Sequence, residues 1–508
     1  MFLGNSEKKG ISGGVLGMDL DDRFAQISFW LPGEQKPETL SAEAGEEEYM
    51  IPAVLCRRTD RDVWTYGREA LETAERGEGV LVERLLSRAL LREQVEAAGE
   101  IFEAASLLAL FIKRSLSLLG GSVSSSGRGS GRGLTRGPIG LEKADFFMFT
   151  FEKVDRQALE MVERIAMLLS LPPEKVSCQS RAESFFYYNV NQPEELWRHQ
   201  CLICDFGGRT LRTRMFEANR HTRPVTVVVS EEEHPELERE IAAGTEYGPQ
   251  GTVRENAAQE NAAQGNVIQE DAAQGNTARG PAGSGLAEDM DDTFLALFGE
   301  LSEGRIIDTV YLIGDGFEGD WYPKTLSVMC VNRRVFRGNN LYSKGACYGG
   351  GYMAGQKKRQ NAGYILPSKA SGRSGGEEYV YLGGDMLKMN LGLEAEKRGE
   401  EVYFSLLDAE MNWFDARGEC DFMLDQDHAF SLRLSPVSGK KGRQIVVTLS
   451  GVPSRPPGAT RIHLTVSCPD AETVKLQMED KGFGDFYPSS GLVWEESFSL
   501  TDVLNEKR

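Results

Sequence analysis

The stretch CLICDFGGRTLRTRMF, residues 201–216, sets one carboxylate and two glycines between two strand-like runs. Apolar residues precede Asp205, the glycines Gly207 and Gly208 follow it, and the residues after Thr210 have an alternating character. Such runs around a glycine-rich tip predict a β-hairpin. Glycines at the tip let backbone N–H groups approach an anion closely, and an aspartate at a strand end can hold hydrated Mg²⁺. The stretch therefore predicts a turn that faces phosphate and a metal ion.

Two further stretches share this design, in which an apolar strand runs into an acidic or glycine-rich turn. They are VLGMDLDDR at 15–23 and VYLIGDGFEG at 310–319. We expect the first two turns, with Asp19 and Asp205, to face each other across a cleft and to grip a metal ion and phosphates. The third turn, with Gly314 and Gly316 at its tip, is expected to cover a nucleoside.

The composition narrows the class of protein. The chain has 508 residues and a formal charge of −20, which predicts several domains and disfavours a nucleic-acid binder, because phosphate backbones need a basic surface. The most apolar stretch, SLLALFIKRSLSLL, is interrupted by Lys113 and Arg114, so no membrane span is predicted. Cys201 and Cys204 form a CxxC without the second half of a zinc site, which favours buried strand residues. We expect a cytoplasmic protein with reduced cysteines.

The rest of the chain predicts strands and helices in mixed order, with two segments that lack regular structure. Strands are expected within 13–30, 51–56, 62–66 and 144–151, helices over 80–119, 155–171, 289–303 and within 333–355, and a strand followed by a helix in 175–190. A Gly/Ser/Arg-rich segment, 120–137, predicts a flexible loop, and five-residue repeats predict a disordered insert at 248–287. Alternating runs over 377–500 predict an all-β domain of the sandwich type.

In their order along the chain, the segments of residues 12–356 resemble the superfamily of actin, sugar kinases and heat-shock chaperone ATPases. LICDFGGRT is similar to the second phosphate loop of the DnaK-type ATPase domain, VLGMDLDDR stands where the first phosphate loop lies, and VYLIGDGFEG is similar to the adenosine loop. The resemblance implies an α/β two-lobed actin-like (ribonuclease H-like) ATPase fold, with lobes at 12–198 and 199–362. The all-β sandwich-like domain at 377–500 follows, as in a bacterial family of this superfamily with a C-terminal β domain.

The resemblance also implies ATP and Mg²⁺ as cofactors and assigns roles to matching residues. Asp19 and Asp205 would hold the metal and take part in catalysis, and Glu183 would orient the attacking water. The residues implied in nucleotide binding are Gly17, Asp22, Gly207, Gly208, Thr210, Gly314 and Gly316. The first loop departs from the family pattern, because Leu20, Asp21, Asp22 and Arg23 stand where Gly and Thr/Ser are usual. The added carboxylates repel phosphate, and Arg23 offsets them in part.

Several functions fit these patterns. The first is a Mg-ATP-binding switch, with weak ATPase activity, whose nucleotide state controls how the β domain engages a protein partner. The second is a nucleotide-independent scaffold or protein-interaction module that retains the fold, which Asp21, Asp22 and a small second lobe favour. A sugar or small-metabolite kinase would need a catalytic base that the residues do not identify. A filament former would be recognised by electron microscopy with ATP.

Overall fold

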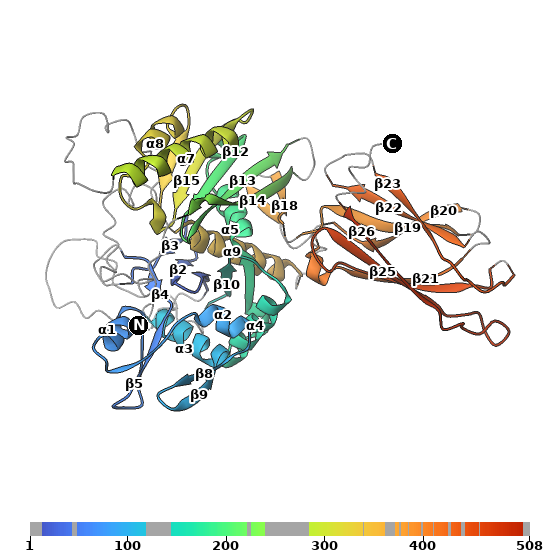
Figure 1. The fold of residues 1–508 in the computed structure, drawn as a ribbon, viewed down its shortest axis with the longest axis horizontal. Helices are drawn as coiled ribbons and strands as arrows, with labels where there is room; N and C mark the ends of the chain where they lie inside the picture. The colour runs from blue at the N-terminus through green and yellow to red at the C-terminus, as the bar shows by residue number, and fades with distance from the viewer. Residues whose placement is uncertain are drawn as a thin grey trace, which may run out of the picture. The chain divides into compact units, whose positions relative to one another are not determined.

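The computed structural model describes residues 13–42, 48–117, 144–220, 225–238, 284–338, 340–360, 371–374, 377–384, 386–397, 400–409, 411–424, 428–437, 442–456 and 458–500. The chain divides into two compact units (Figure 1), residues 1–367 with 371–381 and residues 368–370 with 382–508. We call the first the α/β unit and the second the β unit.

The first sheet of the α/β unit has the order β11-β10-β1-β2-β3, and β4 (Ile51–Pro52) also pairs with β2. Its strands are β1 (Val15–Leu20), β2 (Phe24–Trp30), β3 (Glu38–Thr39), β10 (Phe146–Phe151) and β11 (Val176–Ser180). β1 pairs with β2 antiparallel and with β10 parallel, and β10 pairs with β11 parallel. All residues of β1 and β10 are buried, as expected for central strands covered on both faces.

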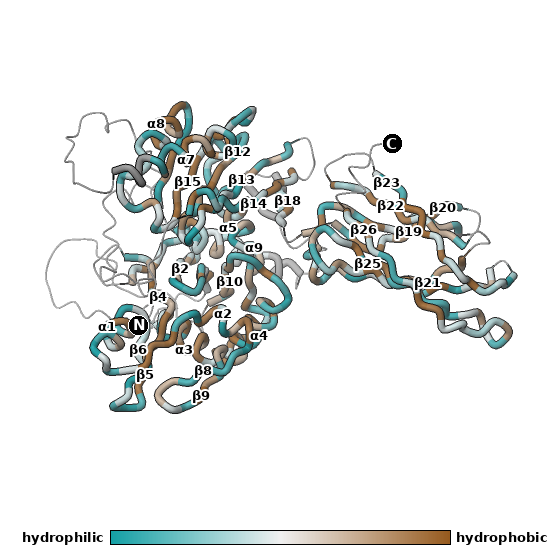
Figure 2. Tube along the Cα trace, in the orientation of Figure 1, coloured by the Kyte–Doolittle hydropathy of each residue, from teal (hydrophilic) through white to brown (hydrophobic). Residues whose placement is uncertain are grey.

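The second sheet repeats this arrangement with other strands. Its order is β16-β15-β12-β13-β14-β18-β17, where β12 (Gln200–Asp205) pairs antiparallel with β13 (Thr210–Asn219) and parallel with β15 (Ile307–Ile313). The next strands are β14 (Val225–Glu238), antiparallel to β13, and β16 (Arg334–Arg337), parallel to β15. The hairpin predicted from residues 201–216 is confirmed, and β15 lies among the most hydrophobic parts of the trace (Figure 2).

Helices connect the parallel strands of both sheets. α4 (Arg156–Leu168) lies between β10 and β11, and α8 (Pro323–Met329) lies between β15 and β16. α4 begins where the Asp155 side chain accepts a hydrogen bond from the amide of Ala158, as an N-cap does. α5 (Arg181–Val190) follows β11, α7 (Ser284–Ser302) precedes β15, and α9 (Leu341–Gln360) follows β16. The helices predicted within 155–171, 175–190, 289–303 and 333–355 are thus confirmed, with shifted ends.

α5 and α9 pack against each other closely, and the small residues of α9 allow it. A Cβ atom on Gly345 would overlap the carbonyl oxygen of Ser184 in α5, and one on Gly17 in β1 would overlap the backbone of α9 at Ser343. Gly17 is therefore needed for the contact between β1 and α9. This contact is a different role from the nucleotide binding predicted for Gly17.

The single helix predicted over 80–119 is wrong. The structure has β7 (Gly79–Val82), α2 (Leu85–Leu90), a hairpin of β8 (Gln94–Ala97) and β9 (Glu100–Glu103), and then α3 (Ala104–Ser117). Ala98 and Gly99 turn the hairpin with φ angles of 52° and 80°, the conformation that a two-residue hairpin turn needs and a helix cannot contain. Ile101 and Phe102 therefore lie in a strand and not in a helix.

Upstream, β5 (Leu55–Arg58) pairs with β6 (Trp64–Tyr66) and β7, and α1 (Gly67–Glu75) follows β6.

The β unit contains two four-stranded antiparallel sheets, as the alternating pattern predicts. One has the order β20-β19-β22-β23 and the other β21-β24-β25-β26. The strands are β19 (Met389–Lys397), β20 (Glu400–Leu407), β21 (Arg417–Met423), β22 (Ala429–Pro436), β23 (Arg443–Thr448), β24 (Arg461–Ser467), β25 (Thr473–Asp480) and β26 (Val493–Ser499). Leu391 and Leu432 of the first sheet share one core with Leu464 and Leu476 of the second. The packing is that of a β-sandwich.

The β unit begins later than residue 377. β17 (Ser371–Ser374) and β18 (Glu377–Leu382) extend the second sheet of the α/β unit beyond β14. The alternating sequence EEYVYL is compatible with a strand of either unit. Its pairing with β14 assigns this strand to the α/β unit. The predicted loop 120–137 lies outside the described residues, as does the insert at 248–287 except for its last residues, where α7 begins at Ser284. No helix in the described part of the chain is long and apolar enough to cross a membrane.

Candidate functional site

The three predicted turns lie together in the α/β unit, and Arg23 joins them. The Arg23 guanidinium donates to the carbonyl oxygen of Gly207 in the second turn and contacts the Asp315 carboxylate of the third turn at 2.7 Å. Gly314 has a φ of 96°, which favours glycine, and a Cβ on it would overlap the backbone at Gly207. Gly316 likewise lies directly against Phe206. The three turns thus contact one another directly, whereas the cleft expected between the first two turns stays a prediction.

In the first turn, the carboxylates of Asp21 and Asp22 accept hydrogen bonds from backbone amides. The Asp21 side chain accepts hydrogen bonds of 2.8 Å from the amides of Arg23 and Phe24, which closes the turn between β1 and β2. The Asp22 side chain accepts from the amide of Ser87, at 2.8 Å, and from its hydroxyl group. Ser87 lies in the first turn of α2, so Asp22 satisfies an otherwise unpaired amide there. The nucleotide-binding role predicted for Asp22 thus competes with a capping contact.

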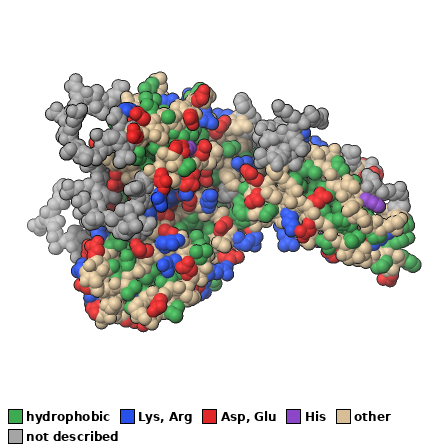
Figure 3. Space-filling model, viewed as in Figure 1, with side chains coloured by type: hydrophobic (Ala, Val, Ile, Leu, Met, Phe, Trp, Pro, Cys, Tyr) green, Lys and Arg blue, Asp and Glu red, His purple; other side chains and the backbone are tan. Residues whose placement is uncertain are grey.

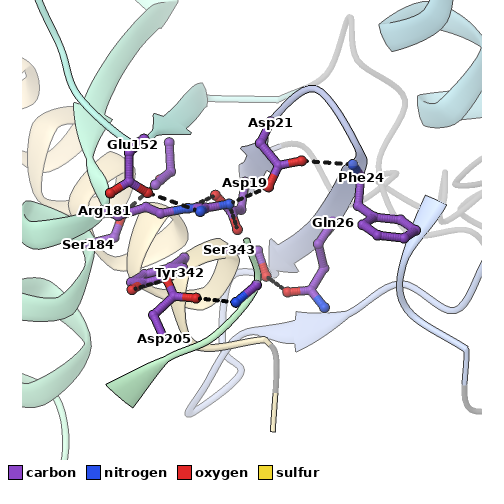
Figure 4. Close-up of polar contacts among 12 residues, drawn as sticks. Asp19, Asp21, Phe24, Gln26, Glu152, Arg181, Ser184, Asp205, Tyr342 and Ser343 are labelled. Atoms are coloured by element: carbon purple, nitrogen blue, oxygen red, sulfur yellow. Dashed lines mark hydrogen bonds and ion pairs between the residues drawn. The ribbon is translucent and has the colours of Figure 1, made fainter. Parts of the chain in front are cut away.

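Arg181 occupies the oxygens of Asp19 that a metal would need. It is the first residue of α5, and its guanidinium bonds both oxygens of Asp19, at 3.0 and 3.2 Å (Figure 4). The same guanidinium contacts Asp21 at 3.0 Å and Glu152 at 3.1 Å. Burial raises the pKa of Asp19 to about 6, although the Arg181 charge acts in the opposite direction. Asp19 is thus a buried carboxylate that is paired with an arginine.

Asp205 has a comparable set of partners on the second sheet. One of its oxygens accepts from the amide of Gly207 at 3.1 Å. The other accepts from Arg214 at 3.1 Å and from the Tyr342 hydroxyl at 3.0 Å. Burial raises the pKa of Tyr342 well above its usual range, so its hydroxyl remains a donor. The Arg214 side chain is 1% exposed and also contacts Glu231 of β14 at 2.6 Å.

Glu152 links the two halves of this cluster. It follows β10 in the first sheet, and its carboxylate contacts Arg181 at 3.1 Å, Arg212 of β13 at 3.0 Å, and Arg214. Burial acts to raise the pKa of Glu152, but Arg214, Arg181 and Arg212 outweigh it and lower the pKa to about 2. One carboxylate therefore holds side chains from the first and second sheets together. We call Asp19, Glu152, Arg181, Asp205, Arg214 and Tyr342 the central ion-pair cluster.

The other predicted site residues lie nearby with different contacts. The Thr210 hydroxyl donates to Glu233 of the adjacent strand β14. A Cβ on Gly208 would meet no atom within 4 Å, so this position of the tip is open. Glu183 lies in the first turn of α5, where its charge adds to burial in raising the pKa of Cys178 and Tyr187. Arg181 is the α5 residue that bonds Asp19, and the water-orienting role of Glu183 stays a prediction.

Glu152, Arg181, Arg214 and Tyr342 were not found from the sequence. Arg212 and Arg214 carry the clearest sequence signal of a charged cluster. They are two residues apart in the strand after Asp205, so their side chains lie on the same face of that strand. Glu152 and Arg181 follow β10 and β11, the two strands that run parallel to β1 on one side of it, so their positions match that of Asp19 at one sheet edge. Charged residues directly after adjacent buried strands could have been grouped on that basis.

The cluster, as it is arranged, does not fit Mg²⁺. A magnesium ion needs acceptor oxygens in octahedral geometry, and both oxygens of Asp19 and of Asp205 already accept hydrogen bonds. The guanidinium groups of Arg181 and Arg214 would also repel a divalent cation at that place. The two carboxylates predicted as metal ligands are instead neutralised by arginines.

Lys344 of α9 is a further buried cation, and its pKa allows the cost of burying a charge to be tested. Burial, and after it the charge of Lys36, lowers the pKa of Lys344 to about 8. Because the folded pKa lies below the unfolded one, Lys344 destabilises the fold below pH 8, and the effect disappears as the pH rises past the unfolded pKa of 10.5. We expect Lys344→Met to raise the free energy of unfolding by roughly 2 kcal/mol at neutral pH and by much less near pH 10.

Urea unfolding at the two pH values measures this effect. The exposed Lys153→Met is the control and should change the stability little at either pH. Equal effects of the two substitutions at neutral pH would contradict the burial cost assigned to Lys344.

Two families match the chain. Residues 36–366 match a family of unknown function described as DUF5716, C-terminal, and residues 386–500 match a domain of unknown function, DUF8552. The second match begins shortly after the start of the β unit, and the first begins after β2, so that Asp19 and Arg23 precede it. No curated protein matches the chain. Because the first match covers more than half of the 508 residues, the chain belongs to the DUF5716 family of unknown function.

Proposed function

We propose that the α/β unit has an actin-like, two-lobed fold and acts as a nucleotide-independent scaffold, while the β unit engages a protein partner. The support for the fold is the repeated sheet order: an antiparallel meander on one side of β1 and β12, and two parallel strands on the other. α5 and α9 occupy equivalent places after the last parallel strand of each sheet. This duplication agrees with the resemblance to actin and the chaperone ATPases, and fold alone does not decide function.

One observation carries the scaffold proposal, namely that arginines bond both carboxylates of the implied metal site. Arg181 bonds both oxygens of Asp19, and the buried Arg214 bonds Asp205. Separating a buried carboxylate from its charged partner costs about 3–5 kcal/mol, which metal binding would have to exceed. Glu152, which contacts Arg181 and Arg214, therefore holds the two sheets together without a metal ion or nucleotide. Basic and acidic side chains are also interspersed on the visible face (Figure 3).

The second candidate is the Mg-ATP-binding switch that the resemblance implies. The meeting of the three turns around Arg23, with the open position at Gly208, favours it. In this case Arg181 and Arg214 would have to release Asp19 and Asp205 when the ligand binds.

The melting temperature with and without millimolar Mg-ATP separates the two functions. For the scaffold we expect no shift of the wild-type melting temperature. A switch at roughly 100 times its Kd would gain about 2.7 kcal/mol, which is an easily measured shift. Gly208→Glu is the matched variant, because its side chain enters open space while its charge repels phosphate. A wild-type shift that Gly208→Glu removes would overturn the scaffold proposal and establish nucleotide binding.

A further inference from the structure

The outer face of one sheet of the β unit forms a hollow that none of the functions above uses. The hollow has a volume of about 950 Å³ and lies across β19, β20, β22 and β23. Its lining includes Asn390, Glu394, Tyr403, Asp408, Arg433 and Gln444. Most of its lining residues are charged or polar, although the opposite face of the same sheet forms the apolar core of the unit. An open hollow with converging polar groups and an aromatic ring is the form of a ligand site.

Tyr403 supplies a fixed aromatic surface within the hollow. A Cβ on Gly392 of β19 would overlap the Tyr403 ring and lie 2.6 Å from its hydroxyl oxygen, so the ring lies directly against this strand. Tyr403 is nevertheless 47% exposed. One side of the ring is therefore held by the sheet, and the remaining surface is available for stacking. A side chain larger than hydrogen at position 392 would displace the ring.

The polar groups beside this ring are held in place by one another. The Glu394 carboxylate accepts from Arg433 at 3.1 Å and from Gln444 at 2.7 Å, which joins three adjacent strands. The Asn390 side-chain oxygen accepts from the amide of Ala409 at 2.8 Å, which orients its NH₂ group as the remaining donor. Asp408 accepts from Ser405 at 2.5 Å. The hollow therefore presents preorganised donors and acceptors around one aromatic ring.

The geometry points to an oligosaccharide as the ligand of this hollow. Sugar hydroxyl groups both donate and accept, which matches amide and guanidinium donors mixed with carboxylate acceptors. The C–H face of a sugar ring is apolar and weakly positive, which complements the negative face of Tyr403. The lining carries Glu394, Glu396 and Asp408 against Arg433, so a cationic peptide is the competing ligand that the test must separate from sugars. The open shape of the hollow suits several linked sugar units better than one. The inference concerns the β unit alone and holds for either proposed function.

Isothermal titration of the full-length chain with cellotetraose, maltotetraose, xylotetraose and chitotetraose tests this inference. We expect at least one of them to bind, Tyr403→Ala to raise its Kd at least tenfold, and Tyr403→Phe to retain binding because the ring remains. Phe404→Ala is the matched control: Phe404 is 50% exposed on the same strand but lies outside the lining of the hollow. Its Kd should be unchanged. The melting temperature of each variant shows whether it is folded.

Three results would overturn the inference. The first is that no oligosaccharide of the set binds at millimolar concentration. The second is that Phe404→Ala weakens binding as much as Tyr403→Ala does, which would place the ligand elsewhere. The third is that a lysine-rich peptide binds in a manner that requires Tyr403 while the sugars do not, which would identify a cationic ligand.

Discussion

Arg214→Met is expected to lower the free energy of unfolding by about 3–5 kcal/mol, the usual cost of removing one partner from a buried ion pair. Arg214 is 1% exposed, and it contacts Asp205, Glu152 and Glu231 from a single guanidinium group. Methionine fills a similar volume but leaves these carboxylates without their shared donor in a low-dielectric surrounding. Urea denaturation followed by circular dichroism measures the change.

The neighbouring Arg212→Met is the matched control for this prediction. Arg212 lies on the same strand and contacts the same Glu152, but it is 42% exposed. Its removal should cost less than about 1 kcal/mol, because solvent screens an exposed pair. Similar losses for the two variants would show that burial of Arg214 does not determine its contribution. The Arg214→Lys variant should recover only part of the stability, since an ammonium group cannot bond three partners in the fork geometry of arginine.

Glu152→Gln is expected to cost about 3 kcal/mol near neutral pH, with an effect that depends on pH in a defined direction. The folded pKa of Glu152 is about 2, below its ordinary value of 4.5. A carboxylate with a lowered pKa contributes stability above its unfolded pKa and loses the contribution as the pH falls through the folded value. The difference between wild type and variant should therefore be full at pH 7 and should nearly vanish close to pH 2.

Unfolding titrations of wild type and Glu152→Gln across this pH range provide the measurement. Glu160→Gln is a suitable control because Glu160 pairs with Arg92 at an exposed position and should show a small difference at every pH. A difference between wild type and Glu152→Gln that stays constant with pH would contradict the assigned ionisation. A double substitution of Glu152 and Arg214 should cost less than the sum of the two single changes, because the two residues share one interaction.

Local sequence patterns were sufficient for most elements of the fold. The hairpin of β12 and β13 follows from an apolar run, a Gly-Gly tip and an alternating run. α4 follows from its amphipathic spacing. The helix predicted over 80–119 failed, because spacing alone did not separate the β8–β9 hairpin, with its turn at Ala98 and Gly99, from helix. The boundary at 377 failed because β18 pairs with the α/β unit.

In the candidate site, too, some features follow from local sequence and others only from tertiary contacts. The three turns were predicted from their glycines and aspartates, and the contacts of Arg23 place them together. The contact of Asp22 with α2 was not predicted, because Ser87 is distant from Asp22 in the sequence. The arginines were missed for the same reason. A single sequence does not say which charged side chain will be buried opposite which other.

The sequence by itself therefore determined many of the strands, most of the helices and the three acidic or glycine-rich turns, because hydrophobic period and turn chemistry act over a few residues. Only the tertiary structure decided that Asp19 pairs with Arg181, that Asp205 pairs with Arg214, and that Glu152 joins the two sheets. These pairs form between residues that sheet pairing brings together from distant parts of the chain. Their strength depends on burial, which is a property of the folded molecule and not of any short segment.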